Sequence, residues 1–290
     1  MALSKVLGVA ETPLLTIAIL VIICIVYTLA VYFGMQGVTR LAASCIYLFF
    51  VLLAYFLFLG GQTRYIIETG ITAIGLLTQN FISLATWTDA LRTSSFPQNW
   101  TIFYWAYWMV WCVAAPFFIG SISKGRTIRQ TVLGGYFFGL AGTFTSFIIL
   151  GNYGLGLQTH GILDLMGLYR ETGDLYQAII AVFETMPAAR FGLILLAVTM
   201  IAFDALTMVA SSYSYRSLDA DEEPDKKVKL FWAITLMLFP IALIFSENSM
   251  SSLQSVSIVA AFPIGFIILM IVWSFFKDAD AYLHDTGSKG

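Results

Sequence analysis

Seven stretches of the chain are each apolar and long enough to cross a lipid bilayer as a helix. Such a helix needs about 20 predominantly apolar residues. Hydrophobic residues make up 59% of the 290 residues and charged ones only 11%, against about 25% charged residues in soluble domains. The sequence therefore excludes a soluble fold and predicts an all-α integral membrane protein. The seven expected spans lie near residues 12–33, 41–61, 100–121, 131–151, 191–214, 229–246 and 253–276.

Two further segments, near residues 65–93 and 172–186, have helical periodicity but mixed polarity. In the first, large apolar residues recur at helical spacing between Glu68, Thr72 and Gln79. This pattern is typical of an amphipathic helix that lies at the membrane interface. A poorly formed transmembrane span is the alternative interpretation.

Positively charged residues fall mainly on one side of the expected spans. Ten of the 15 Lys and Arg residues lie in segments that follow the first, third, fifth and seventh spans. Because short cytoplasmic segments carry an excess of Lys and Arg, the C-terminus is expected in the cytoplasm. An odd number of spans then places the N-terminus outside. No signal peptide explains an outside start, and the first ten residues look more like a loop between two spans.

Charge, histidine and cysteine content argue against several classes of function. The formal net charge is -2, without the basic stripe that nucleic-acid binding needs, so no nucleic-acid partner is expected. The chain has two histidines, His160 and His284, and its three cysteines match no metal-binding spacing. The sequence also contains no evident pairing of a nucleophile with a base. We therefore expect neither an enzyme nor a resident metal or other cofactor.

The third span begins with an aromatic stripe. Ring faces suit a quaternary ammonium ion, which has no N–H to donate and is bound through cation–π contacts worth about 2 kcal/mol when desolvated. Packing against neighbouring helices is the alternative, although buried Trp and Tyr side chains need hydrogen-bond partners. At about 3.6 residues per turn, one broad helix face contains Trp100, Phe103, Tyr104, Tyr107, Trp108 and Trp111.

The aromatic stripe is part of a longer motif. Residues 96–108 read Phe-Pro-Gln-Asn-Trp-Thr-Ile-Phe-Tyr-Trp-Ala-Tyr-Trp, which resembles the tryptophan-rich eighth span of the betaine/carnitine/choline transporter family. Residues 122–129 are similar to the basic loop that follows that span, and residues 253–261 are similar to the family's last span. Weaker similarity covers nearly the whole chain.

This resemblance implies a transporter fold with two inverted repeats of five helices each, in which the seven spans are similar to spans six to twelve of twelve. It implies a homotrimer in the cell membrane of a bacterium or archaeon, surrounded by the lipid bilayer. The substrate would be a small trimethylammonium compound moved by alternating access. The expected parts are residues 1–62, the last two spans of the first repeat; 63–99, an extracytoplasmic connection with the interfacial helix; 100–276, the second repeat; and 277–290, a cytoplasmic tail.

The resemblance also assigns substrate-binding roles to four aromatic residues. Trp108 would form a wall of the central substrate site, with Tyr107 beside it. Trp111 would line the inner pathway, and Trp100 would lie near an outer, secondary site. Tyr107 departs from the family's usual tryptophan, so the preference among glycine betaine, carnitine and choline is open.

The same resemblance places the outer gate at Phe103, and we include Trp105 with it. Sodium-coupled relatives carry adjacent hydroxyl residues midway along the tenth span, where this sequence has Thr207 and Met208. A thioether is a poor ligand for a hard cation, which argues against sodium coupling. The acidic loop at residues 219–224 resembles the carnitine-exchanger branch, where sodium is not needed. Asp204 is the acid well inside an expected span, and it is either a proton-coupling group or a protonated acid bonded to a neighbouring Ser or Thr.

The sequence leaves three alternatives to the interpretation as a quaternary-ammonium transporter. In the first, the chain is a truncated or split subunit that does not transport alone, because a site between two repeats needs helices from both. Another polypeptide would then supply the missing N-terminal spans. The second is a seven-span receptor, which shares the expected positions of the termini. The third, an intramembrane enzyme, is the weakest.

Overall fold

The computed structural model describes residues 1–94, 96–214 and 249–287, with single positions between 227 and 241. This part of the chain is helical and contains no strand, which confirms the predicted all-α class. Most of the expected span at 229–246 lies outside the described residues. Five helical segments of the described part are long and apolar enough to cross a membrane: Pro13–Tyr32, Gly34–Leu59, Ile128–Thr159, Ala189–Val209 and Ser255–His284.

The chain divides into two compact units, each built from segments that are far apart in the sequence. The first contains Met1–Phe81 and Ser123–Ala242, and the second contains Ile82–Ile122 and Leu243–Gly290. The boundaries expected at residues 62, 99 and 276 come from the resemblance, and they stay a prediction.

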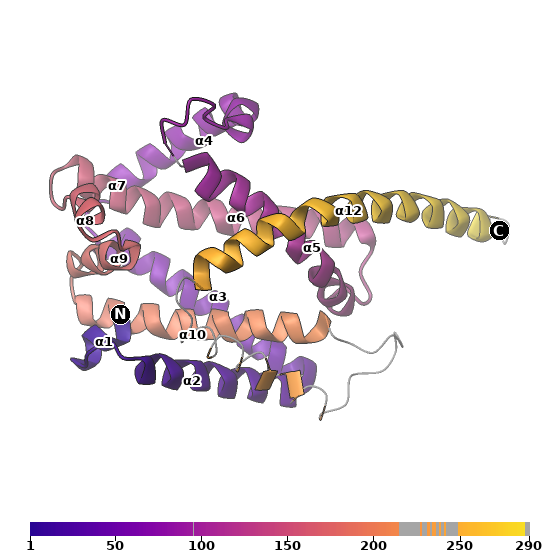
Figure 1. Cartoon of the computed structure of the whole chain (residues 1–290), viewed down its shortest axis with the longest axis horizontal. Coiled ribbons are helices and arrows are strands. Elements are labelled where there is room, and N and C mark those ends of the chain that lie inside the picture. The colour runs from indigo at the N-terminus through magenta and orange to yellow at the C-terminus, as the bar shows by residue number, and fades with distance from the viewer. Residues whose placement is uncertain are drawn as a thin grey trace. The chain divides into compact units, whose positions relative to one another are not determined.

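Three long helices pack against one another in the first unit: α2 (Pro13–Tyr32), α3 (Gly34–Leu59) and α10 (Ala189–Ser214). Figure 1 shows α2 and α10 lying along each other, with α3 against both. The Thr12 hydroxyl caps α2 by accepting a backbone N–H, and proline occupies the first turn, as is usual at helix starts. Gly34 has φ 63°, a conformation that glycine adopts at little cost, and it makes the tight turn into α3.

The other helices described in the first unit are shorter or more polar. One of them, α4, corresponds to the amphipathic helix expected at 65–93; it is kinked at Asn80 and passes into the second unit after Phe81. Its predicted place at the membrane interface stays a prediction. The set comprises α1 (Ala2–Leu7), α4 (Thr63–Thr86), α6 (Ile128–Ser146), the π-helical turn η2 (Phe147–Gly151), α7 (Asn152–Thr159), α8 (Leu165–Thr172) and α9 (Leu175–Glu184).

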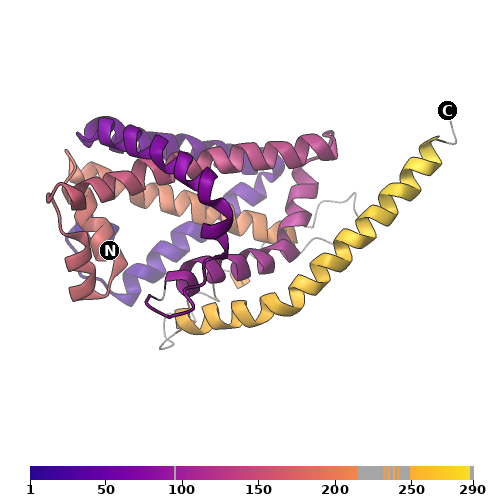
Figure 2. The same ribbon diagram turned by 90° about the horizontal axis from the view of Figure 1, so that it is seen from above.

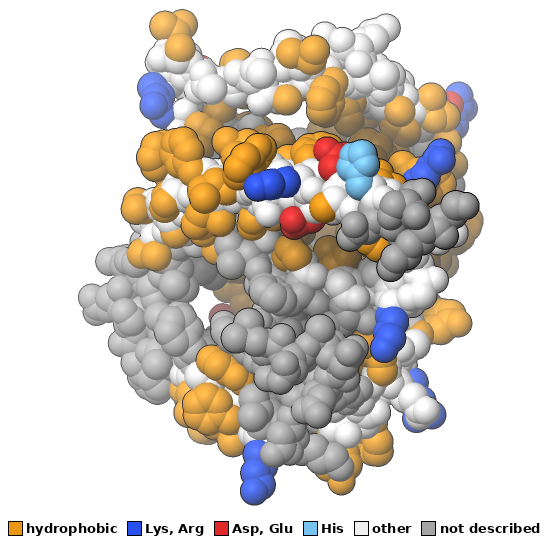
Figure 3. Space-filling model, turned by 90° about the vertical axis from the view of Figure 1, so that its right-hand side faces the viewer, with side chains coloured by type: hydrophobic (Ala, Val, Ile, Leu, Met, Phe, Trp, Pro, Cys, Tyr) orange, Lys and Arg blue, Asp and Glu red, His pale blue; other side chains and the backbone are white. Residues whose placement is uncertain are grey.

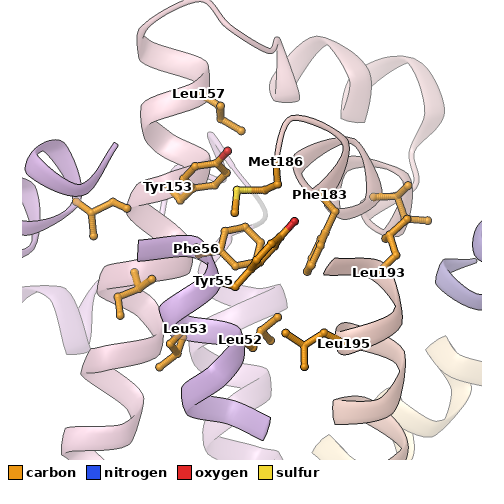
Figure 4. Close-up of a cluster of buried hydrophobic side chains, with 13 residues drawn as sticks. Leu52, Leu53, Tyr55, Phe56, Tyr153, Leu157, Phe183, Met186, Leu193 and Leu195 are labelled. Atoms are coloured by element: carbon orange, nitrogen blue, oxygen red, sulfur yellow. The ribbon is translucent and has the colours of Figure 1, made fainter. Parts of the chain in front are cut away.

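A buried apolar cluster joins α3 to α7, α9 and the start of α10 (Figure 4). The Phe56 ring lies at its centre, with the rings of Tyr153 and Phe183 edge-on to it at centroid distances of 5.1 and 4.9 Å. The polar ends of the tyrosines are satisfied, because the Tyr55 hydroxyl donates to the Pro187 carbonyl at 2.8 Å and the Tyr153 hydroxyl is hydrogen-bonded to a threonine. Buried tyrosines of this kind fix the helix ends as well as filling space.

The second unit is built around two helices, α5 (Phe103–Ile122) and α12 (Ser249–Gly287), which pack along each other. Figure 2 shows α12 running beside α5 and continuing beyond it. At about 1.5 Å per residue, the 39 residues of α12 exceed the hydrocarbon thickness of about 30 Å. The helix therefore continues past the span expected at 253–276 and includes most of the segment expected to be a tail.

Large apolar side chains are exposed over much of the described surface. Leu14, Ile82 and Phe262 are among the most exposed of them, and Figure 3 shows hydrophobic side chains lying open on one face among scattered charged ones. Soluble monomers rarely expose contiguous apolar patches larger than a few hundred Å². The surface is that of a protein whose solvent is largely lipid.

Candidate functional site

The aromatic stripe begins in a wide helical turn that the sequence pattern does not reveal. Residues Pro97–Ile102 form the π-helical turn η1, and α5 follows without a break. The expected regular spacing of 3.6 residues per turn from Trp100 onward is therefore wrong for this first turn. Such π turns are rare in proteins overall, and those that occur are often found at functional sites. The extra width here falls where the aromatic residues start.

Two rows of neighbouring rings run along this helix. In the first, the rings of Trp100 and Tyr104 lie 5.9 Å apart with 13° between their planes, and Phe96 lies 6.4 Å from Trp100 on the other side. In the second, Phe103 and Tyr107 are 5.9 Å apart. Phe96 was absent from the expected stripe, although its spacing of four residues from Trp100 could have revealed it.

The rings expected to bind substrate remain open in the structure. Trp108 is 60% exposed and Tyr107 is 38% exposed. Trp105, expected at the outer gate, is 62% exposed. The Tyr107 and Trp108 rings meet at 6.2 Å and 78°, so their faces point in different directions. Trp111 is half-buried. An indole face and a phenol face at right angles can bound two sides of a small cation.

A cation–π pair also lies within the second unit. The Lys277 ammonium lies 5.8 Å from the centroid of the Trp273 ring on α12. This distance is within the range for an attractive contact. It was not anticipated from the sequence, because the pair lies in the segment where a span was expected to give way to a polar tail.

A short loop before η1 is held by an acidic side chain. The buried Asp89 carboxylate accepts from the Ser94 backbone N–H at 2.6 Å and from the Thr93 hydroxyl at 3.0 Å. These bonds, the Ser94 N–H foremost, lower the pKa of Asp89 below its ordinary value. Gln98 of η1 donates to the Thr88 carbonyl at 3.0 Å. The loop thereby fixes the start of the aromatic helix.

The residues considered for coupling lie on α10, in the first unit. Asp204 and Thr207 are three residues apart and so share a helix face. The Thr207 hydroxyl donates to the Phe203 carbonyl at 3.0 Å, an intrahelical bond common for this residue type. Ala205 and Val209 point into the core of the unit. No cluster of three or more His, Cys, Asp or Glu side chains able to hold a metal occurs among the described residues.

The structure therefore groups the predicted site residues by unit. Asp204 and Thr207 belong to the first unit. The six aromatic residues of the predicted site, Trp100, Phe103, Trp105, Tyr107, Trp108 and Trp111, all lie on η1 and α5 of the second unit.

These features define the class: a multi-pass, all-α membrane protein with one helix rich in aromatic residues. Residues 1–283 match the sequence profile of BCCT, the betaine/carnitine/choline family transporters. The chain belongs to this family of transporters, as the motif at residues 96–108 predicted.

Two curated relatives illustrate the similarity. The chain is 28% identical over 279 residues to a carnitine transporter of Acinetobacter baumannii, a match that covers 94% of this chain and 50% of that protein. It is also 28% identical over 222 residues to the uncharacterized transporter YeaV of Escherichia coli K12, covering 75% of this chain and 46% of that protein. The chain thus spans about half the length of the curated relatives it matches.

Proposed function

We propose that this chain takes part in the membrane transport of quaternary ammonium compounds such as carnitine, glycine betaine or choline, by alternating access. The observation that carries the proposal is the pair of open, nearly perpendicular rings of Tyr107 and Trp108. A trimethylammonium group cannot donate a hydrogen bond, and ring faces are the protein groups that attract it. The relative named as a carnitine transporter supports carnitine as the first compound to examine.

The aromatic residues divide the work of recognition. Trp108 and Tyr107 contact the cation, and the Tyr107 hydroxyl can donate to the carboxylate of a zwitterionic substrate. Trp111 lines the path inward and Trp100 receives the substrate first. This arrangement attracts the positive end of the substrate without a fixed negative charge, which would hold the substrate too strongly for release.

Phe103 and Trp105 form the outer gate in this proposal. Coupling does not use sodium, because Met208 follows Thr207 and a thioether is a poor ligand for that ion. Transport is then an exchange of substrates or is linked to protons at Asp204. The chain lies in the cell membrane of a bacterium or archaeon with its C-terminus in the cytoplasm, and it assembles as a trimer.

Equilibrium binding of radiolabelled carnitine and glycine betaine to the purified 290-residue chain tests the proposal. Trp108→Ala should weaken binding by about tenfold or more, since a desolvated cation–π contact is worth about 2 kcal/mol. Trp108→Phe should retain most of the binding. Trp87→Ala, which removes an exposed tryptophan outside the stripe, is the control. Equal binding by wild type and Trp108→Ala would reject the proposed site.

A second possibility is that the chain binds substrate only when it packs with another polypeptide. It is favoured by the open faces of Trp105 and Trp108, since a substrate enclosed on all sides needs a further wall. Coexpression with the N-terminal half of the Acinetobacter baumannii relative distinguishes the two cases. Binding that requires the coexpressed half supports the second, and binding by the chain alone supports the first.

A further inference from the structure

The helical segment that follows the basic loop changes its geometry partway along its length. Residues Ile128–Thr159 are continuously helical and long and apolar enough to cross a membrane, and Figure 1 shows α6 and α7 following one another along this segment. Between them lies the π-helical turn η2, Phe147–Gly151. Sharp bends in helices occur at a few kinds of position, and π turns are one of them. The whole segment belongs to the first unit and contains none of the residues proposed to bind substrate.

The part of the segment after η2 is held on several sides. The Tyr153 ring packs edge-on against Phe56 in the buried cluster (Figure 4), and its hydroxyl is hydrogen-bonded to the Thr185 hydroxyl at 2.9 Å. The buried Asn152 carboxamide donates to the Ile66 carbonyl of α4 at 3.4 Å. Helix α7 is therefore attached to α3, to α4 and to the turn that follows α9.

Helix α4 also packs against the wide turn itself. A Cβ at Gly70 of α4 would overlap the Ile148 Cγ2 atom, so the two helices approach closely there. Ile149 is buried in the apolar cluster, whereas Phe147 is 73% exposed. One side of η2 is therefore packed against the first unit, and the other side is open.

The part of the segment before η2 has no such attachment. None of the 19 residues of α6, all of which the structure describes, is buried. Two hydroxyls at its end bond to its own backbone: Thr145 donates to the Ala141 carbonyl at 2.6 Å, and Ser146 donates to the Thr143 carbonyl at 2.9 Å. Bonds of this kind compete with the helix ladder and often bend helices. The loss of burial, the competing hydroxyls and the π turn thus coincide at one place.

Helix α6 also continues the chain from the second unit into the first. Only residues 123–127 separate its start from the end of α5, the helix with the aromatic rings. A tilt of α6 about η2 would move its first turn without disturbing α7. Hinges in proteins are a few residues at the end of an element that absorb a change of this kind.

We propose that η2 is a hinge about which α6 tilts while α7 stays fixed on α3 and α4. At about 1.5 Å per residue, the 19 residues of α6 convert a small change of angle at η2 into a large displacement at Ile128. This displacement lets α5 and its aromatic rings take more than one position, a use of the hinge that rests on the proposed transport function. The hinge itself needs no substrate.

Distances between two spin labels on the detergent-purified 290-residue chain, measured by double electron–electron resonance, test the hinge. Every variant carries Cys112→Ala, because Cys112 is exposed and the other two cysteines are buried. The first pair, Val132→Cys on α6 with Tyr47→Cys on α3, reports on α6. The second pair, Leu155→Cys on α7 with Tyr47→Cys, reports on the fixed part. All three labelled positions are exposed, and the distance distribution of the first pair should be clearly the broader. Equal widths for the two pairs would overturn the proposal.

Two glycines provide a matched pair of variants. A Cβ at Gly151 in η2 and a Cβ at Gly139 in α6 would each meet nothing within 4 Å. Alanine restricts the backbone in a similar way at both positions. Gly151→Ala should narrow the distribution of the first pair toward that of the second, whereas Gly139→Ala should leave it unchanged.

Deletion of Phe147 tests the π turn more directly. It removes one exposed residue from the wide turn, so α6 should join α7 as a regular α-helix and the breadth of the first pair should be lost. Deletion of Phe138, an equally exposed residue of α6, is the control and should keep the breadth. A broad distribution that survives both Gly151→Ala and the deletion of Phe147 would show that η2 is not the hinge.

Added carnitine tests the link to transport separately. It should shift the distribution of the first pair and leave that of the second unchanged, because a ligand favours the position to which it binds more tightly. Carnitine that binds without shifting the first pair would overturn the link between the hinge and transport. If carnitine does not bind and the two widths still differ, the proposed function is wrong and the hinge is supported.

Discussion

The indole of Trp100 and the phenol ring of Tyr104 are stacked across the junction of η1 and α5, 5.9 Å apart and 13° from parallel. The stack connects a residue of the π-helical turn to a residue of the regular helix, so it stabilises the conformation of the wide turn. Offset stacking of this kind stabilises a ring pair by about 0.5–1.5 kcal/mol.

Trp100→Ala should therefore weaken substrate binding less than Trp108→Ala does. The loss expected is about twofold to tenfold, equal to the free energy of one ring pair. Trp100→Phe keeps a ring and should restore most of the affinity. Equilibrium binding of radiolabelled carnitine to the purified chain measures the difference. A loss for Trp100→Ala as large as that for Trp108→Ala would mean that the indole belongs to the central site.

Much of the fold follows from hydrophobicity and length. Helix α2 and the part of α3 after Arg40 are largely apolar runs. A run of this kind in lipid is helical, since every backbone group must be satisfied within the segment. The amphipathic character of α4 was also predictable, because its polar residues interrupt the apolar ones at helical spacing.

Contacts between distant segments could not be predicted in this way. The Tyr55 hydroxyl meets the Pro187 carbonyl across 132 positions of sequence, and no periodicity encodes such a pairing. The π turn at Pro97–Ile102 was missed for a related reason, because a pattern read at 3.6 residues per turn assumes a regular helix. The close contact of Gln62 with Gly156 depends on the approach of α7, which only the folded chain reveals.

Gly156→Ala should destabilise the chain, contrary to the usual effect of replacing glycine in a helix. Alanine is favoured over glycine by about 0.5–1 kcal/mol in a helix interior, but here the new Cβ would overlap Gln62 Oε1. The overlapping atom is the end of a flexible side chain, so Gln62 turns aside at a cost near the lower end of the range of about 1–3 kcal/mol that is typical of overpacking. A slightly lower unfolding temperature in detergent is expected. Gly154→Ala on the same helix meets only the Leu165 Cδ1 at 3.7 Å, and this control should be neutral or stabilising.

The Gly156→Ala defect should be relieved by shortening its neighbour. In the double variant with Gln62→Ala the overlapping oxygen is gone, so the unfolding temperature should return toward that of wild type. A double variant as unstable as Gly156→Ala alone would show that the glycine is needed for another reason.

Tyr55→Phe should loosen the attachment of α3 to the start of α10. The variant loses the bond to the Pro187 carbonyl and leaves that carbonyl without this donor, at a cost of about 0.5–1.5 kcal/mol. Tyr47→Phe on the same helix removes a hydroxyl from an exposed ring and should have no effect. Thermal unfolding of both variants in the same detergent makes the comparison, and equal unfolding temperatures would contradict the assigned role.

The loop before η1 should lose its order in acid. The hydrogen bonds from Ser94 and Thr93 lower the pKa of Asp89. The ionised carboxylate is therefore more stable in the folded loop than in the unfolded one. This contribution is complete above the ordinary carboxyl pKa of about 4, and it is lost as the pH falls through the lowered value. Hydrogen exchange of the segment 88–94, corrected for the intrinsic effect of pH, should show protection that disappears over this acidic range. Asp89→Asn should show weaker protection that does not vary with pH, because an amide does not titrate. Wild-type protection that persists unchanged far below pH 4 would mean that the backbone turn, and not the carboxylate, holds the loop.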